Sequence, residues 1–234
     1  MFSILKRLKK AENKWELKTL IVGGLYEVVF LIRHPKFKYL FVVEPERLDI
    51  DNEKRKTTSP YIPTPYYFLI LSLSEIKKLV GDVGSAVFID VGCGTGRALY
   101  CSSTFGFNHL IGIEHSRRLS EICNENLKRY LPSNVKTKIV NSDIRDVDFL
   151  ELIGYMNNRI GIRNLIFFLF TPFKDSVLEV FLDKVNLISN SFNCYIVYFG
   201  PQNERMIVEK GFMLSHADYF NKDTPIKIYR RLRE

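Results

Sequence analysis

The sequence predicts an α/β protein built on a mostly parallel sheet, and three observations support this class. From about Ser85 onward, short apolar runs alternate with segments of helical period, as in βαβ units. The runs are nearly continuous, as strands covered by helices on both faces should be. The chain then closes with two strand-like runs joined by a short turn. That turn has no room for a crossover helix, so these two strands should form an antiparallel hairpin.

The individual elements follow from apolar spacing. The predicted strands are 87–91, 110–113, 135–140, 165–170 and 195–199, with hairpin strands at 212–220 and 226–232. The predicted helices are 66–80, 96–105, 116–130 and a segment whose apolar stripe is Val177, Val180, Phe181, Val185 and Ile188. Ser116 is a typical N-cap, and Pro132 lies just past the end of the same helix.

The first 58 residues form a predicted basic, mainly helical extension, followed by one domain from residue 59 to 234. Residues 15–32 have a helical pattern, whereas residues 45–56 are polar and are expected to be loop. The proline-rich segment SPYIPTP, residues 59–65, connects the two parts.

Composition excludes several classes of protein. The 234 residues are 46% hydrophobic and 26% charged, which is typical of a globular domain rather than a disordered or disulfide-rich one. The longest apolar run, residues 20–32, contains two glycines and Glu27, and is too short to span a bilayer. The four cysteines have no metal-ligand spacing and no cleavable leader is recognisable. We therefore expect a soluble cytoplasmic protein without a bound metal.

The net charge of +8 is confined to the two ends of the chain. Residues 61–221 have as many basic as acidic side chains, and the excess lies in residues 1–60 and 222–234. The basic opening MFSILKRLKK is expected either to contact nucleic acid, anionic lipid or an acidic protein, or simply to be a solvated helix face.

A glycine-rich loop carries the strongest functional signal. In FIDVGCGTGR, residues 88–97, three glycines at 92, 94 and 96 follow a predicted strand and precede a predicted helix. Open α/β sheets bind ligands at this position, although a tight turn without a ligand has the same pattern. Glu114 and Asp143 follow the next two strands. They could accept hydrogen bonds from a ribose and from an exocyclic amine, which outlines a nucleoside site. Asp90 would repel a pyrophosphate, so NAD is the weaker option.

At these residues the chain resembles the class I S-adenosylmethionine-dependent methyltransferases, whose first motif is acid-x-Gly-x-Gly-x-Gly. The resemblance covers about residues 60–232 and implies a seven-stranded Rossmann-like sheet with helices on both faces. It places Asp90, Gly92, Gly94 and Gly96 around the methionine part of the cofactor, Glu114 at the ribose, and Asp143 with Ile144 at the adenine. Cys93, Arg97 and His115 adjoin these residues and complete the candidate cofactor contacts around the loop and strand ends.

Two further segments concern the substrate side. Thr171, Pro172 and Phe173 follow the fourth predicted strand, where related amine methyltransferases have Asn or Asp before proline. They are the candidate catalytic residues, or else an ordinary helix start. YIPTP resembles a segment that precedes the sheet in small bacterial and archaeal methyltransferases related to seven-strand protein lysine methyltransferases. Tyr61 and Thr64 are therefore candidate lid contacts, unless the segment is only a proline-fixed linker.

These features together predict methyl transfer from S-adenosylmethionine to a protein, with a lysine side chain as the first candidate acceptor. The alternatives are a nucleic-acid methyltransferase, which the basic termini favour, a small-molecule methyltransferase, and a cofactor-binding protein without activity.

Overall fold

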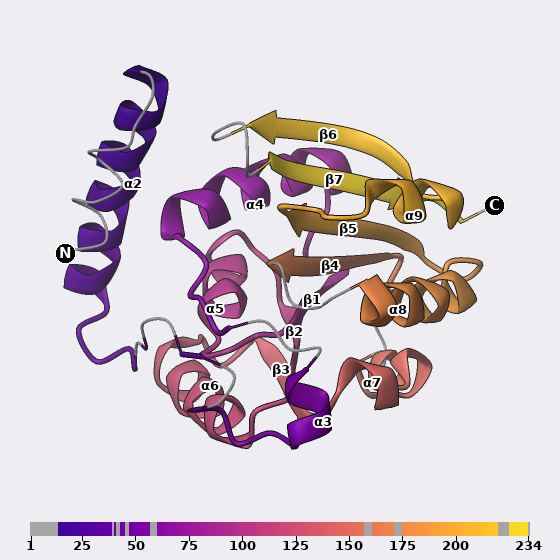
Figure 1. Cartoon of the computed structure of the whole chain (residues 1–234), viewed down its shortest axis with the longest axis horizontal. Coiled ribbons are helices and arrows are strands. Elements are labelled where there is room, and N and C mark those ends of the chain that lie inside the picture. Colours follow the sequence, from indigo (N-terminus) through magenta and orange to yellow (C-terminus); the bar gives the residue numbers. More distant parts are fainter. Residues whose placement is uncertain are drawn as a thin grey trace.

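The computed structural model describes residues 14–38, 40, 43–44, 47–56, 60–156, 161–170, 175–219 and 225–233. Within these residues, seven strands form one sheet in the order β3-β2-β1-β4-β5-β7-β6 (Figure 1). The strands are β1 (Ala86–Val91), β2 (His109–Glu114), β3 (Lys136–Asn141), β4 (Asn164–Phe170), β5 (Asn193–Phe199), β6 (Met213–Tyr219) and β7 (Pro225–Arg231). The first five are parallel to one another, whereas β7 is antiparallel to β5 and to β6. The predicted α/β class, sheet and closing hairpin are confirmed.

Helices cover both faces of this sheet (Figure 1). The described helices are α2 (Lys14–Arg33), α3 (Asn52–Arg55), α4 (Tyr66–Val80), α5 (Arg97–Thr104), α6 (Arg117–Tyr130), α7 (Phe149–Met156), α8 (Asp175–Ile188) and α9 (Glu204–Glu209). Strand side chains alternate between the two faces. Phe88 and Ile166 belong to the core under α4, α5 and α6, whereas Ile89 and Phe167 belong to the core under α7 and α8. The sheet is thus a rigid platform whose carboxyl edge remains open.

Two local predictions are wrong. The strand at 135–140 is not covered on both faces, because β3 lies at the edge of the sheet and its first two residues are exposed. Residues 45–56 are not all loop, because they include the short helix α3. Neither strand order nor a one-turn helix leaves a periodic signal in the sequence.

The described part of the N-terminal extension shares the main core. α2 confirms the predicted helix and packs against α4, with the ring centroids of Tyr26 and Tyr67 5.1 Å apart. Phe30 and Phe37 are buried in the same hydrophobic core as α4 and α5. The basic opening MFSILKRLKK and the predicted boundary at residue 58 lie outside the described residues.

Among the described helices, none is both long and apolar enough to cross a membrane. All four cysteines are buried free thiols.

Candidate active site

A cleft opens at the carboxyl ends of β1, β2, β3 and β4, beside the point where the strand order reverses between β1 and β4. Ligands of open α/β sheets bind at such a switch point. The lining residues come from the glycine loop, from the next two strand ends and from the segment 60–64 (hereafter the strap). They include Tyr61, Thr64, Asp90, Gly92, Cys93, Arg97, Glu114, His115, Asp143 and Ile144, all of them predicted cofactor contacts.

The glycine loop turns back onto β2 through its backbone. The amides of Gly92 and Cys93 both donate to the carbonyl of Ile113, at 2.8 and 3.1 Å. Gly94 and Gly96 have positive φ angles of 52° and 84°, a region that favours glycine. The sequence therefore places glycine where the turn requires it.

At both glycines, the absence of a side chain lets another part of the protein pack close to the loop. A Cβ on Gly94 would lie 2.2 Å from the Tyr61 ring, and a Cβ on Gly96 would lie 2.7 Å from the sulfur of Cys123. The space at Gly94, expected to be left for a ligand, is filled here by the strap. The absence of a side chain at Gly96 allows the start of α5 to pack closely against α6.

Asp90 is the most enclosed acid of the cleft. Its side chain lies within β1, is only 4% exposed and contributes to the cleft lining. No donor in the described part of the chain forms a hydrogen bond with its carboxylate. Burial, with a smaller effect from the charge of Glu114, raises the pKa of Asp90 well above its ordinary value. The cleft therefore has a carboxyl group that a bound cation would stabilise in its charged form.

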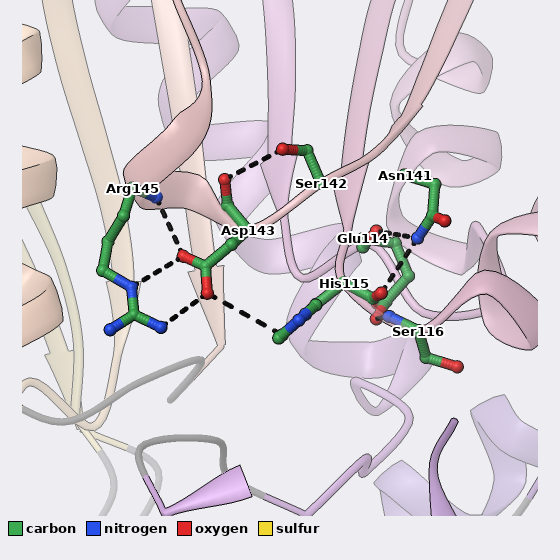
Figure 2. Close-up of polar contacts among 7 residues, drawn as sticks. All are labelled: Glu114, His115, Ser116, Asn141, Ser142, Asp143 and Arg145. Atoms are coloured by element: carbon green, nitrogen blue, oxygen red, sulfur yellow. Dashed lines mark hydrogen bonds and ion pairs between the residues drawn. The ribbon is translucent and has the colours of Figure 1, made fainter. Parts of the chain in front are cut away.

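Glu114 ends β2 and fastens the glycine loop to the start of α6. Its two carboxylate oxygens accept hydrogen bonds from the backbone amides of Gly94 and Ser116, both at 2.8 Å. Burial raises the pKa of Glu114, and the backbone hydrogen bonds oppose this shift. The Asn141 side chain bonds to the Glu114 and His115 carbonyls (Figure 2). The Glu114 carboxylate retains some acceptor capacity for a ligand hydroxyl.

Asp143 follows β3 and is held mainly by Arg145. The Arg145 backbone amide and Nε donate to Oδ1 at 2.9 Å, and Nη2 donates to Oδ2 at 2.7 Å (Figure 2). The His115 Nδ1 atom lies 3.9 Å from Oδ2. Burial opposes the charged form, but the hydrogen bonds from Arg145 outweigh it and lower the pKa of Asp143 to about 2. Only a little acceptor capacity remains on Asp143 for an adenine amine.

The strap crosses the glycine loop and is fastened at both ends. The Tyr61 hydroxyl lies 3.0 Å from the Thr95 hydroxyl, and the Tyr61 backbone forms a two-bond antiparallel bridge with Val43. At the other end, the Thr64 carbonyl accepts a hydrogen bond from Arg97 Nη1 at 3.0 Å. Tyr61 and Thr64 therefore lie beside the glycine loop, and their role as lid contacts to a cofactor stays a prediction.

The strand order is the one observation that decides the fold. Along the sheet, β2 and β3 follow β1 on one side, and β4 and β5 follow it on the other. The antiparallel strand β7 then lies between β5 and β6. The precorrin-6y C5,15-methyltransferase of Geobacter metallireducens superposes with a TM-score of 0.51 at 11% identity, covering 83% of this chain and 100% of that one. This is the fold of the class I S-adenosylmethionine-dependent methyltransferases.

Two further proteins are similar to this chain. The PH0226 protein of Pyrococcus horikoshii superposes with a TM-score of 0.50 at 15% identity, covering 71% of this chain and 91% of that one. An uncharacterized protein of Methanocaldococcus jannaschii, MJ0284, is 33% identical over 148 residues, which span 58% of this chain and 63% of that relative. No protein-family model matches the chain.

One residue of the candidate site has contacts that the sequence does not reveal. Arg97 lines the cleft, and its guanidinium packs against the ring of Phe30 and bonds to Thr64 and to Glu27 of α2. Its contact with the cofactor stays a prediction. The residues predicted to be catalytic, Thr171, Pro172 and Phe173, lie outside the described residues. Phe170 and Val177, on either side of them in the sequence, both line the cleft.

Sequence reasoning missed the N-terminal part of the candidate site. Leu48 lines the cleft. The next residue, Asp49, accepts hydrogen bonds from the Ser116 hydroxyl and from the Arg118 amide, so it caps α6 together with Ser116. Burial opposes ionisation of Asp49, but these hydrogen bonds outweigh it and lower its pKa. Both residues lie in a polar stretch with no motif, so only the folded structure reveals their position.

Proposed function

We propose that the chain is a methyltransferase that uses S-adenosylmethionine and acts on a protein, with a lysine side chain as the acceptor. The observation that carries the cofactor assignment is the buried Asp90 carboxyl in the cleft wall. It has no hydrogen-bond donor in the described part of the chain, and a cation in the cleft would offset the unfavourable burial of its charge. The amino and sulfonium groups of S-adenosylmethionine are cationic.

The other cleft residues fit the rest of this cofactor. Glu114 would accept hydrogen bonds from the ribose hydroxyls, and Ile144 would pack against the adenine beside Asp143. A dinucleotide fits less well, because Asp90 would face its pyrophosphate with a carboxyl group. The fold also agrees, since the structural neighbour from G. metallireducens is named a methyltransferase.

The chain's own contribution to the chemistry would be positioning. The cofactor supplies a methyl group that is already activated on sulfur, so no dedicated base is required to activate it. Holding the acceptor close and aligned can lower a barrier by about 7 to 11 kcal/mol. Phe170 and Val177 provide an apolar wall on the acceptor side, and apolar surroundings lower the pKa of a lysine amine toward its neutral, nucleophilic form. Thr171 is the candidate hydrogen-bond acceptor for that amine.

The charge near the cleft favours a cationic substrate. Residues 44–53 contain five acidic side chains and one arginine, and Leu48 within this stretch lines the cleft. Glu44 and Asp51 are exposed. Such a stretch attracts a lysine-bearing segment and repels a polyanion. The nucleic-acid alternative is supported by the basic excess in residues 222–234, which includes two arginines at the end of β7.

Labelling of a cell lysate tests the substrate class. The purified chain and S-adenosylmethionine carrying a labelled methyl group are added to the lysate, and the products are treated with protease or with nuclease. We expect the label in a protease-sensitive fraction and on lysine after hydrolysis. Label that is lost only on nuclease treatment would instead identify a nucleic acid. Label that remains in the low-molecular-weight fraction, beyond that of a control without enzyme, would identify a small molecule.

A Thr171→Val variant tests the catalytic role of that residue. The substitution keeps the shape and removes the hydrogen bond, so we expect cofactor affinity within about threefold of wild type and turnover reduced about tenfold or more, as for an interaction made in the transition state. Full activity would assign Thr171 to an ordinary helix start. Thr171→Asn restores the residue type of related amine methyltransferases and should retain activity toward an amine.

A further inference from the structure

The side chain of Arg97 connects three segments that are far apart in the sequence. Its Nη1 donates to the Thr64 carbonyl of the strap at 3.0 Å, and its Nη2 lies 2.6 Å from Oε2 of Glu27 in α2. The other oxygen of Glu27 accepts a hydrogen bond from the Tyr66 backbone amide at 2.6 Å, just after the strap. The Glu27 carboxylate therefore bonds to Tyr66, which closely follows the strap, and is linked through Arg97 to Thr64 at the end of the strap.

The Arg97 guanidinium depends on this carboxylate. Its side chain is 3% exposed, and the guanidinium carbon lies 4.3 Å from the centroid of the Phe30 ring. A buried cation is costly unless a charged partner and hydrogen bonds compensate it. Glu27 is a carboxylate in direct contact with it, and the Glu27 side chain is itself only 25% exposed. The conformation in which Arg97 reaches Thr64 is thus stabilised by Glu27.

The strap in turn covers the glycine loop. The Tyr61 ring packs directly on Gly94, and its hydroxyl bonds to Thr95. Tyr61 and Thr64 are three residues apart on a segment stiffened by Pro60, Pro63 and Pro65. A shift at the Thr64 end will therefore move the Tyr61 ring over the loop.

We propose that Glu27 is a positioning residue for cofactor binding, which acts through Arg97 and Tyr66 to hold the strap over the glycine loop. This inference rests on the proposed function, since it assigns the cleft beneath the strap to the cofactor. It gives α2 a role in the site although none of the α2 residues whose side chains are described lines the cleft. It also explains why an arginine at the start of α5 points toward the N-terminal helix.

A double-mutant cycle on cofactor binding tests the inference. Affinity for S-adenosylhomocysteine is measured by calorimetry for wild type, Glu27→Gln, Tyr61→Ala and the double variant. If Glu27 acts through the strap, Glu27→Gln should weaken binding about tenfold in the wild-type background and less than about threefold when Tyr61 is already absent. An equal effect in both backgrounds, or an affinity within about threefold of wild type for Glu27→Gln alone, would overturn the inference.

Glu204→Gln is the matched control. Glu204 also bonds to a nearly buried cation, Lys227 at 2.6 Å, and to the hydroxyl of Tyr229, but it lies on α9 and does not line the cleft. The Glu204→Gln substitution should lower thermal stability as Glu27→Gln does, and it should leave cofactor affinity unchanged. If Glu204→Gln weakens binding as much as Glu27→Gln does, then loss of stability explains both effects and the inference is wrong.

Hydrogen exchange separates this inference from the cofactor assignment, because it requires no ligand. The amides of Val43, Tyr61 and Tyr66 are hydrogen-bonded when the strap is in place. Glu27→Gln should accelerate their exchange about tenfold or more, and Glu204→Gln should not. Unchanged exchange would contradict the inference even if the cofactor binds. Faster exchange in a protein that binds no adenosyl ligand would contradict the proposed function instead.

Discussion

The two halves of the cleft hold their acidic side chains in different ways. On the β1–β2 side, Asp90 and Glu114 are almost fully buried, and Glu114 is bonded by backbone amides of the glycine loop and of α6. On the β3 side, Asp143 is buried to a similar extent, but it is bonded by a partly exposed arginine at the edge of the sheet. Burial raises the pKa of Glu114, whereas the hydrogen bonds from Arg145 lower that of Asp143 against an opposing effect of burial.

This difference separates two functions that the sequence assigned to similar residues. Glu114 is part of the internal structure of the glycine loop, so its removal alters the loop itself. Asp143 and Arg145 form a local pair whose bonds join residues two positions apart in the sequence, so we expect its removal to leave the loop unchanged. The place of a carboxylate in the sequence, at a strand end, therefore predicts that it lies in the cleft. Its hydrogen-bond partners decide whether it also holds the glycine loop in place.

Removal of the Glu114 carboxylate should have the largest effect. Glu114→Ala removes the acceptors for the Gly94 and Ser116 amides, and hydrogen bonds to a charged group contribute about 1.5 to 3 kcal/mol each. We expect affinity for S-adenosylhomocysteine to fall about a hundredfold or more, as measured by calorimetry. An unchanged dissociation constant in a folded variant would place the ribose elsewhere.

A methyl group at Gly94 should have the next largest effect. The added Cβ would overlap the Tyr61 ring, and the φ angle of 52° is unfavourable for alanine. Gly94→Ala should therefore displace the strap and weaken cofactor binding about tenfold. Gly154→Ala is the matched control, because a Cβ at Gly154 of α7 meets no atom within 4 Å. Equal binding by both variants would show that strap position is unimportant for the cofactor.

Neutralising Asp143 should have a smaller effect. Asp143→Asn keeps the side-chain shape and weakens the pair with Arg145, whose side chain is 36% exposed. We expect affinity to fall about threefold to fivefold, since the carboxylate has little acceptor capacity left for the ligand. Arg145→Gln should have an effect of similar size, measured in the same titration. A loss as large as that of Glu114→Ala would remove the distinction between the two halves.

The pH dependence of stability should differ in sign for the two carboxylates. The folded pKa of Asp143 is about 2, below the ordinary 3.8, so its stabilising contribution is complete above about pH 4 and is lost as pH falls toward 2. The folded pKa of Glu114 is raised, so its contribution decreases as pH rises above the ordinary value. Urea unfolding across pH should show a shallower acid decline for Asp143→Asn, by about 1 kcal/mol at most. Glu114→Gln should remove the decline in stability that Glu114 causes as pH rises above its ordinary pKa of 4.5. Identical slopes in both variants would contradict the assignment.

The sequence predicts those parts of the molecule that local patterns determine. The helix at 66–80 and the N-cap at Ser116 follow from spacing and residue type, and both are confirmed. The positions of Glu114 and Asp143 in one cleft follow from the shared carboxyl edge of parallel strands. The partners of Arg97 do not follow, because Glu27 lies 70 residues away in the sequence and only packing of α2 on α4 brings it near. The filling of the space at Gly94 by Tyr61 is equally a tertiary contact.

Titration of the wild-type chain with three ligands tests the central claim most directly. Calorimetry under one set of conditions compares the affinities of S-adenosylmethionine, S-adenosylhomocysteine and NAD for the cleft. We expect saturable binding of both adenosyl ligands with one site per chain, no binding of NAD, and adenosyl binding weakened about a hundredfold or more in Glu114→Ala. Saturable binding of NAD with no response to either adenosyl ligand would contradict the central claim.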